Sequence, residues 1–202
     1  MDFIDQYLTE LESVVRRISR DDVRRIVDAL VDAWSARRTI FIIGNGGSAA
    51  TASHMMNDIN KFTIVDGLPR FRCIALTDNV PLMTAIGNDA SYADVFVELM
   101  RNLFNDDDLL IAISASGNSP NIVKAVEYAK EHGATVIGFC GQPGGKLAQL
   151  ADLKVVIPAD RIGQQEDGHM ILDHVISAAL YDRLREGSVA RGVAVADRGT
   201  RQ

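Results

Sequence analysis

Apolar side chains recur every three or four residues over the first 36 positions of the chain. This spacing predicts helices, each with a wide apolar stripe along one side. We expect the second of these helices to begin at Asp21 or Asp22, either of which can cap it. The stripe positions are Phe3, Tyr7, Leu8, Leu11, Val14, Val15, Ile18, Val23, Ile26, Val27, Leu30, Val31 and Trp34. Only part of such a surface can face the chain's own core, so helix contacts between subunits are also expected.

After these helices the pattern changes to short apolar, β-branched runs separated by helical segments. The runs are 39–43, 71–76, 109–113, 135–139 and 153–157. Helices are expected from Ser48, over 120–132 and over 167–184, with Pro120 in a first turn and Gly133 after a last one. Strands that alternate with helices predict an α/β fold, in which a five-stranded parallel sheet is the middle layer of a three-layer sandwich.

The chain is expected to form a single domain. Its 202 residues suffice for one full core, and neither a linker nor an internal repeat interrupts them. We place that domain at 1–186, including the N-terminal helices over 1–36. The segment 187–202 mixes Gly, Arg, Ala and Asp without periodicity, which predicts a loose tail or a short interface arm.

Charge and composition exclude several classes of protein. The net charge is −6 and no long basic cluster is present, so no nucleic-acid surface is indicated. No apolar stretch approaches the ~20 residues that span a bilayer, and the acidic N-terminus lacks a signal sequence. Cys73 and Cys140 lie in apolar runs, as buried reduced thiols do. A cytoplasmic protein is expected, with no membrane or nucleic-acid partner.

Two loops rich in glycine and serine each follow a predicted strand and precede a predicted helix. At the carboxyl end of a parallel strand, such a loop offers free backbone N–H groups and hydroxyls to a phosphate. The first lacks the lysine of a Walker A motif and the spacing of a dinucleotide site. Ordinary strand-to-helix turns also favour Gly and Ser, and this alternative stays open for each loop alone. The candidate phosphate-binding residues are Asn45, Gly46, Gly47, Ser48, Ser114, Ser116 and Ser119.

At four places the sequence resembles the sugar isomerase (SIS) domain family, and within it the phosphoheptose isomerases. The matching segments are IGNGGSAA at 43–50, LTDN with AIGND between 76 and 89, ISASGNSPN at 113–121 and GQPGGKL at 141–147. The resemblance covers about residues 2–185. It implies the SIS fold, conversion of sedoheptulose 7-phosphate to D-glycero-D-manno-heptose 7-phosphate, and a homotetramer with active sites between subunits.

Two predicted helices carry residues that suit a metal or proton transfer. His54 and Asp58 are four residues apart, and therefore lie on one face of their helix. The last helix is unusually polar, with Gln164, Gln165, Glu166, Asp167, His169, Asp173 and His174. Imidazole and carboxylate groups are ligands of Zn²⁺. The alternative is a set of solvent-facing polar pairs, and for His169 a structural role is equally open.

The resemblance implies one zinc ion per subunit, held by His54, Asp58, Glu166 and His174. Two of these residues depart from the family, which has Glu at position 58 and Gln at 166. Asp58 is shorter by one methylene, about 1.5 Å. A misplacement of that size can cost about a hundredfold in rate. Either the pocket compensates for the departures, or the chain belongs to a divergent sub-branch in which the substrate or the reaction differs.

The implied reaction moves a proton between C1 and C2 of the sugar through an enediol. We assign Asp58 as the base and His174 as the second proton carrier, with zinc polarising the carbonyl. Residues expected to bind sugar hydroxyls are Asn45, Asp78, Asn79, Asn88, Asp89 and Glu166. Two alternatives remain: an isomerase of another sugar phosphate, and a non-catalytic SIS protein that binds a partner. The combination of His54, Asp58, Glu166 and His174 favours an enzyme.

Overall fold

The computed structural model describes residues 2–190, built around a five-stranded parallel sheet. Its strands are β1 (Ile40–Gly44), β2 (Cys73–Ala75), β3 (Leu109–Ser114), β4 (Thr135–Gly141) and β5 (Leu153–Ile157), in the order β2-β1-β3-β4-β5. All neighbours pair in parallel, and Gly44 at the end of β1 is in register with Ile113. The predicted α/β fold with five parallel strands is confirmed.

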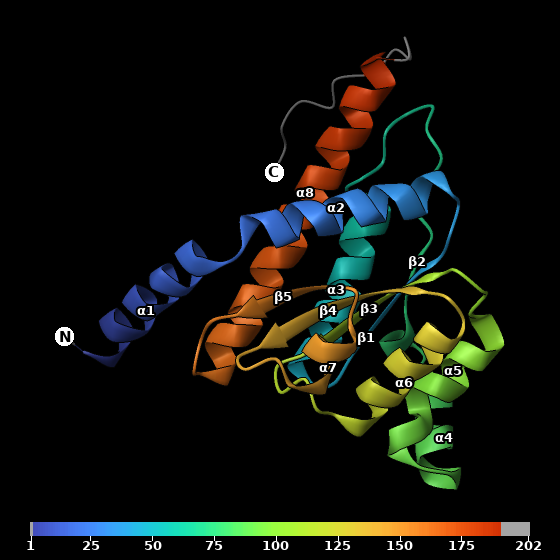
Figure 1. Ribbon diagram of the computed structural model, residues 1–202, viewed down its shortest axis with the longest axis horizontal. Helices are drawn as coiled ribbons and strands as arrows, with labels where there is room; N and C mark the ends of the chain where they lie inside the picture. Colours follow the sequence, from blue (N-terminus) through green and yellow to red (C-terminus); the bar gives the residue numbers. More distant parts are fainter. Residues whose placement is uncertain (1, 191–202) are drawn as a thin grey trace.

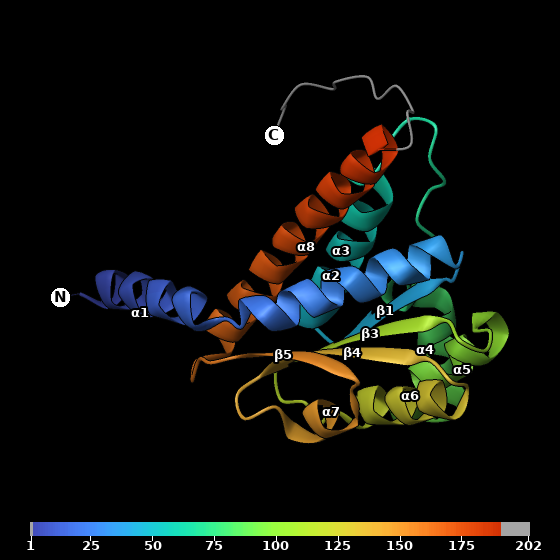
Figure 2. The ribbon, with the colours of Figure 1, turned by 45° about the horizontal axis from the view of Figure 1, so that its top comes forward.

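Helices cover both faces of the sheet, which gives three layers (Figure 2). One face carries α2 (Arg20–Ser35), α3 (Gly47–Lys61) and α8 (Ile162–Ala190). The other carries α5 (Val95–Leu103), α6 (Pro120–Glu131) and α7 (Gly145–Leu150), with α4 (Val80–Asp89) packed beside them. Two 3₁₀ turns, Leu76–Asp78 and Tyr92–Asp94, lie before and after α4.

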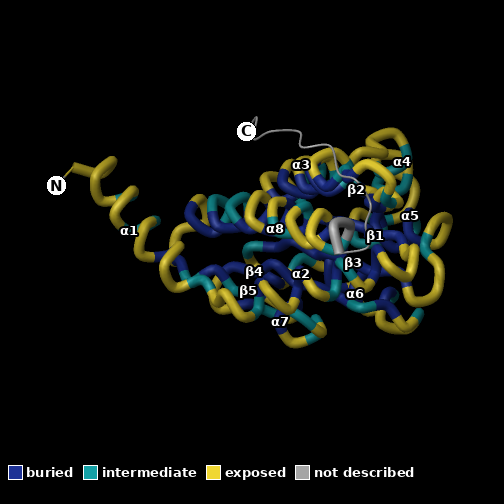
Figure 3. Tube along the Cα trace, turned by 90° about the horizontal axis from the view of Figure 1, so that it is seen from above, coloured by how far each residue is buried: buried dark blue, intermediate teal, exposed yellow. Residues whose placement is uncertain are grey.

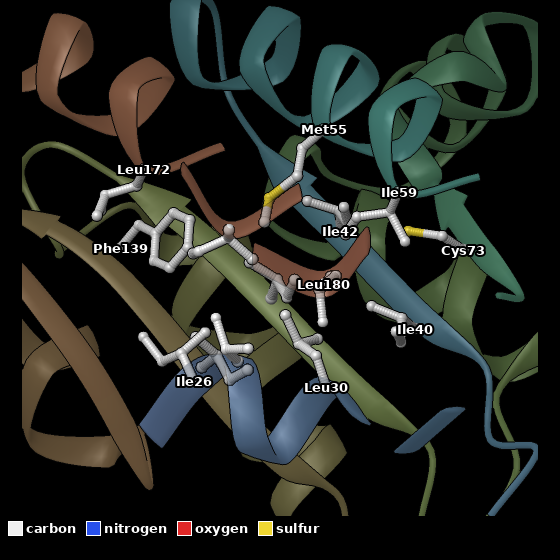
Figure 4. Close-up of a cluster of buried hydrophobic side chains, with 14 of the residues drawn as sticks. Ile26, Leu30, Ile40, Ile42, Met55, Ile59, Cys73, Phe139, Leu172 and Leu180 are labelled. Atoms are coloured by element: carbon white, nitrogen blue, oxygen red, sulfur yellow. The ribbon is translucent and has the colours of Figure 1, made fainter. Parts of the chain in front are cut away.

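The central strands are buried on both sides, which explains why their sequences are continuous apolar runs. In β1, Ile40 and Ile42 join the core under α2, α3 and α8, whereas Phe41 and Ile43 join the core under α5 and α6. Figure 4 shows the first of these cores, where Met55 of α3 lies with Ile40 and Ile42. Both helix layers are thereby fixed against the strands that carry the candidate loops.

The first helix, α1 (Phe3–Arg17), extends away from the three layers (Figure 1) and is exposed along most of its length (Figure 3). Its apolar stripe is mostly uncovered: Phe3, Ile4 and Leu8 keep 62%, 66% and 59% of their surface exposed. Val14, near its end, is buried in the core. The predicted stripe therefore exists, and much of it is left uncovered by the other described residues.

Several predicted boundaries need correction. The second helix is capped by Ser19, whereas Asp21 and Asp22 lie in its first turn, where the helix dipole favours acidic residues. The last helix begins at Ile162 and continues through residues 187–190, which the sequence placed in the tail; residues 191–202 of that tail lie outside the described part. The helices α4, α5 and α7 were not predicted. Within residues 2–190, no helix is long and apolar enough to cross a membrane.

Candidate functional site

The two predicted loops lie side by side, because β1 and β3 are neighbours and end at the same edge of the sheet. The amides of Asn45 and Asn121 exchange two hydrogen bonds of 2.9 Å between the first loop and the first turn of α6. Tyr92 also donates its hydroxyl hydrogen to Asn45 Oδ1, over 3.0 Å. Asn45 is therefore held by protein partners and fixes the spacing of the loops. Asn121 and Tyr92 were not predicted as site residues.

The second loop has the form of an anion cup at the start of the 12-residue helix α6. Ser114 is buried and its Oγ accepts a hydrogen bond from the Gly117 N–H, whereas Ser116 is exposed. Ser119 precedes the helix and its side chain makes no capping hydrogen bond. A bound phosphate would meet the positive end of the helix dipole and these hydroxyls.

The segment 144–147 braces this cup. The backbone N–H of Leu147 donates to Gly117 O over 2.9 Å, and that of Lys146 donates to Asn118 Oδ1 over 3.0 Å. Part of the GQPGGKL motif therefore braces the second loop.

The first loop differs from the second because the Glu166 carboxylate packs against it. A Cβ atom at Gly47 would lie 2.4 Å from Glu166 Oε1, so glycine at this position leaves the room that the Glu166 side chain occupies. Ser48 is buried. A phosphate dianion at this loop would be repelled by the Glu166 charge. The arrangement therefore favours an anion at the second loop rather than at the first.

Gly47→Ala is expected to lower catalytic efficiency about tenfold or more with little change in stability. The new methyl group would displace the Glu166 carboxylate, which is the end of a flexible side chain and can move. Steady-state kinetics and urea unfolding of the variant test this. Ala50→Gly on the same helix, at an exposed position, is the control for a general effect on α3. Unchanged kinetics of Gly47→Ala would contradict a role for the Glu166 position.

Four side chains from two adjacent helices converge on one point beyond the loops. His54 and Asp58 lie on α3, and Asp173 and His174 lie on α8; one ligand atom from each lies within 4.8 Å of all the others. The two histidine Nε2 atoms are 3.2 Å apart. His54 Nε2 is 3.4 Å from Asp58 Oδ2 and 4.0 Å from Asp173 Oδ2. Such a group of two imidazoles and two carboxylates can hold a divalent metal.

The two carboxylates of this group are buried, and their hydrogen bonding is incomplete. Asp58 is 1% and Asp173 0% exposed, and the Oδ2 atom of each has no hydrogen-bond partner among the described residues. Burial, and then the neighbouring Asp58 charge, raise the pKa of Asp173 to about 7. Unpaired buried carboxylates are costly, and a cation between them would offset that cost. The donor set therefore fits a metal ion such as Zn²⁺.

Three of the four predicted metal ligands are together in this group, and Glu166 is not among them. The helices α3 and α8 run side by side (Figure 2), with Glu166 at Gly47 and His174 at His54. Eight residues of helix, a rise of about 12 Å, separate Glu166 from His174. Gln165 is buried and donates to Ala159 O over 2.7 Å, so its role is structural.

The remaining predicted sugar-binding residues lie around α4. Asp78 accepts a short hydrogen bond from Ser53 Oγ of α3, which places it beside the helix that carries His54. Asn79 caps α4 through Leu82 N. Asn88 donates to Asp89 over 2.8 Å at the exposed far end of α4. In the described residues, neither Asn88 nor Asp89 forms a hydrogen bond with either loop, so their predicted role stays a prediction.

His169 lies in the core beneath the site. It is completely buried and stacks on Phe139, with ring centroids 6.3 Å apart. Burial lowers its pKa to about 4. A buried neutral ring of this kind supports the structural alternative considered for His169. Cys73 and Cys140 are likewise buried free thiols, as predicted, and burial raises the pKa of each.

His169 should make the protein less stable in mild acid. Its folded pKa lies below the ordinary value of about 6.5, so only the unfolded chain takes up the proton as the pH falls from 6.5 towards 4, and stability declines. The full contribution is about 3 kcal/mol. Urea unfolding in the presence of chelator should show His169→Leu gaining stability relative to the parent between pH 7.5 and 5. Because Asp173 titrates nearby with the opposite sign, only the difference between the two proteins is diagnostic; a pH-independent difference would contradict the prediction.

Comparisons with known proteins identify the family of this chain. The SIS domain family matches residues 2–141. The phosphoheptose isomerase of Burkholderia pseudomallei (strain K96243) is 34% identical over 181 residues, covering 86% of this chain and 90% of the relative. That of Aneurinibacillus thermoaerophilus is 31% identical over 190 residues, covering 91% and 94%. The structure of phosphoheptose isomerase GmhA from Neisseria gonorrhoeae superposes with a TM-score of 0.81 at 28% identity, over 88% of this chain and 96% of that one. The chain therefore belongs to the SIS-domain family, in its phosphoheptose isomerase branch.

Proposed function

We propose that this protein converts sedoheptulose 7-phosphate into D-glycero-D-manno-heptose 7-phosphate. Its family makes it a phosphosugar isomerase of the aldose–ketose type. The observation that carries the finer proposal is that the chain combines an anion cup at the start of α6 with an exposed histidine pair on α3 and α8. The first can hold a phosphate, and the second can reach the reacting carbons.

The distance between the first loop and the histidine pair favours a long substrate. Seven residues of α3, a rise of about 10 Å, separate Gly47 from His54. We place the phosphate at Ser114, Ser116 and Ser119, and the sugar hydroxyls along the first loop and Glu166. The C1 and C2 end then lies near His54 and His174. A three-carbon sugar phosphate would be too short to occupy both ends.

The proton transfer needs a group that can touch the substrate. His174 is exposed, and with its Nε2 atom free of metal it can take a proton from C1 and return it to C2. Asp58, the predicted base, is 1% exposed beneath the two histidines, which suits holding them or a metal better than direct contact with a sugar. Zn²⁺ bound by His54, Asp58 and His174 would polarise the carbonyl and stabilise enediolate charge.

Assembly into a homotetramer belongs to the same proposal. The exposed stripe of α1, with Phe3, Ile4 and Leu8, is an apolar surface that a second copy of this chain could cover. The same helix contacts α8 beside the site, where Tyr7 donates to Asp167 Oδ2 over 2.6 Å. Packing of α1 between subunits would therefore also fix the helix that carries Glu166 and His174.

The direct test is incubation of the purified protein with ketose phosphates of five to seven carbons, followed by detection of the aldose product. Sedoheptulose 7-phosphate should be converted with the highest kcat/KM. A preference for a shorter ketose phosphate would contradict the proposed substrate and would agree with the altered substrate that Asp58 and Glu166 suggest. Binding without conversion of any of these sugars would support a non-catalytic SIS protein.

A further inference from the structure

We propose that Asp173 is the fourth ligand of the metal site, with His54, Asp58 and His174, and that Glu166 lies outside the ligand set. The inference rests on the proposed function in one respect, the use of a divalent metal by this site. It differs in the ligands, since the family resemblance assigns the fourth position to residue 166. The site would join α3 to α8 through two side chains from each helix.

The hydrogen bonds leave one oxygen of each carboxylate free for a metal. Asn57 Nδ2 donates to Asp58 Oδ1 over 3.0 Å, and Ser177 Oγ donates to Asp173 Oδ1 over 3.3 Å. The Oδ2 atoms face the histidines and have no hydrogen-bond partner in the described chain. One oxygen fixed by a donor and the other free is the arrangement in which protein carboxylates bind a metal.

The distances also suit a single ion. In a tetrahedral zinc site with bonds of about 2.1 Å, neighbouring ligand atoms are about 3.4 Å apart. The Nε2 atoms of His54 and His174 are 3.2 Å apart, and His54 Nε2 lies 3.4 Å from Asp58 Oδ2. Asp173 Oδ2, at 4.0 Å from His54 Nε2, requires only a small movement.

Charge favours a cation at this point. Asp58 and Asp173 are almost completely buried, and their like charges act on each other. Two carboxylates and two neutral imidazoles around a divalent ion give a neutral centre, which removes the repulsion. The competing explanation, a proton shared by the two carboxylates, predicts that the protein takes up no metal.

Glu166 lies away from the metal group. Its carboxylate fills the space over Gly47, one end of the helix pair, while the metal group lies about 12 Å further along α8. At Gly47 it can accept hydrogen bonds from sugar hydroxyls. Ligation by Asp173 therefore releases Glu166 for contact with the substrate.

The test measures zinc affinity of the full chain by competition with a chromophoric chelator, after removal of bound metal. Asp173→Asn should bind Zn²⁺ at least about 100-fold more weakly than the parent, and Ser177→Ala about tenfold more weakly, because it loses the hydrogen bond that orients Asp173. Glu166→Gln, the matched carboxylate-to-amide control on the same helix, should stay within about threefold of the parent.

Circular dichroism and the melting temperatures of the metal-free proteins establish that the variants are folded. If Asp173→Asn does not fold, Ser177→Ala provides a second measurement. Parent-like affinity in Asp173→Asn, or an equal loss in Glu166→Gln, would overturn the inference. A parent that takes up no zinc would overturn it as well. Isomerase assays separate the two proposals: a parent that converts a ketose phosphate while Asp173→Asn keeps the parent's zinc affinity refutes the ligand set and leaves the proposed function standing.

Discussion

His174→Gln is expected to lower kcat/KM about 10²- to 10⁴-fold while the protein stays folded. The substitution removes the exposed imidazole assigned to proton transfer, and a positioned acid-base group contributes about that factor to the rate. It also removes a nitrogen that lies 3.2 Å from His54 Nε2 in the metal group. Because the side chain is exposed, the change in unfolding free energy should stay within about 0.5 kcal/mol for the metal-free protein. Steady-state kinetics and urea unfolding measure both quantities.

His132→Gln is the matched control for that experiment. His132 lies at the C-terminal end of α6, where its ring packs on Tyr128 with centroids 4.2 Å apart. The N-terminal end of the same helix forms the anion cup, so this substitution is remote from the proposed chemistry. The control should retain activity within about threefold of the parent. A His174→Gln enzyme within tenfold of the parent would remove His174 from proton transfer.

The sheet could be predicted because its strands are recognisable in the sequence as apolar runs. Strands β1 and β3 are buried on both faces, so each is a continuous apolar run ending at a glycine or serine loop. The helix α4 could not be predicted in the same way. None of its residues is fully buried, so hydrophobic periodicity hardly marks it. Patterns of apolar residues report burial, and elements that bury little leave little signal.

From residue spacing alone, the metal group was predictable only where its residues lie on one helix. His54 and Asp58 are one helical turn apart, and that local spacing is visible in the sequence. Asp173 stood among the polar residues of the last helix but was not assigned, because its proximity to Asp58 depends on how α3 packs against α8. The pairing of Asn45 with Asn121 likewise depends on β1 and β3 being neighbours. A contact between distant segments follows from packing geometry, which periodicity does not specify.

Gly117→Ala is expected to destabilise the protein by about 3 kcal/mol or more, or to prevent its accumulation as a folded chain. Gly117 has a φ of +63°, a conformation that costs other residues about 1–2 kcal/mol. A Cβ atom there would lie 2.0 Å from Gly144 O, a backbone atom that cannot move aside alone. The clash would separate the anion cup from the segment that braces it, breaking the Leu147 N to Gly117 O hydrogen bond.

Gly133→Ala separates the cost of backbone strain from the cost of the steric clash in Gly117→Ala. Gly133 also has a positive φ, +74°, but a Cβ there would meet only Asp107 Oδ1, a side-chain atom, at 3.1 Å. It should therefore lose about 1–2 kcal/mol from backbone strain alone. Urea unfolding of both variants gives the difference, which measures how tightly the cup is packed against its brace. Equal losses would mean that the contact between Gly117 and Gly144 relaxes freely. The second loop would then depend on its own hydrogen bonds rather than on the segment 144–147 that braces it.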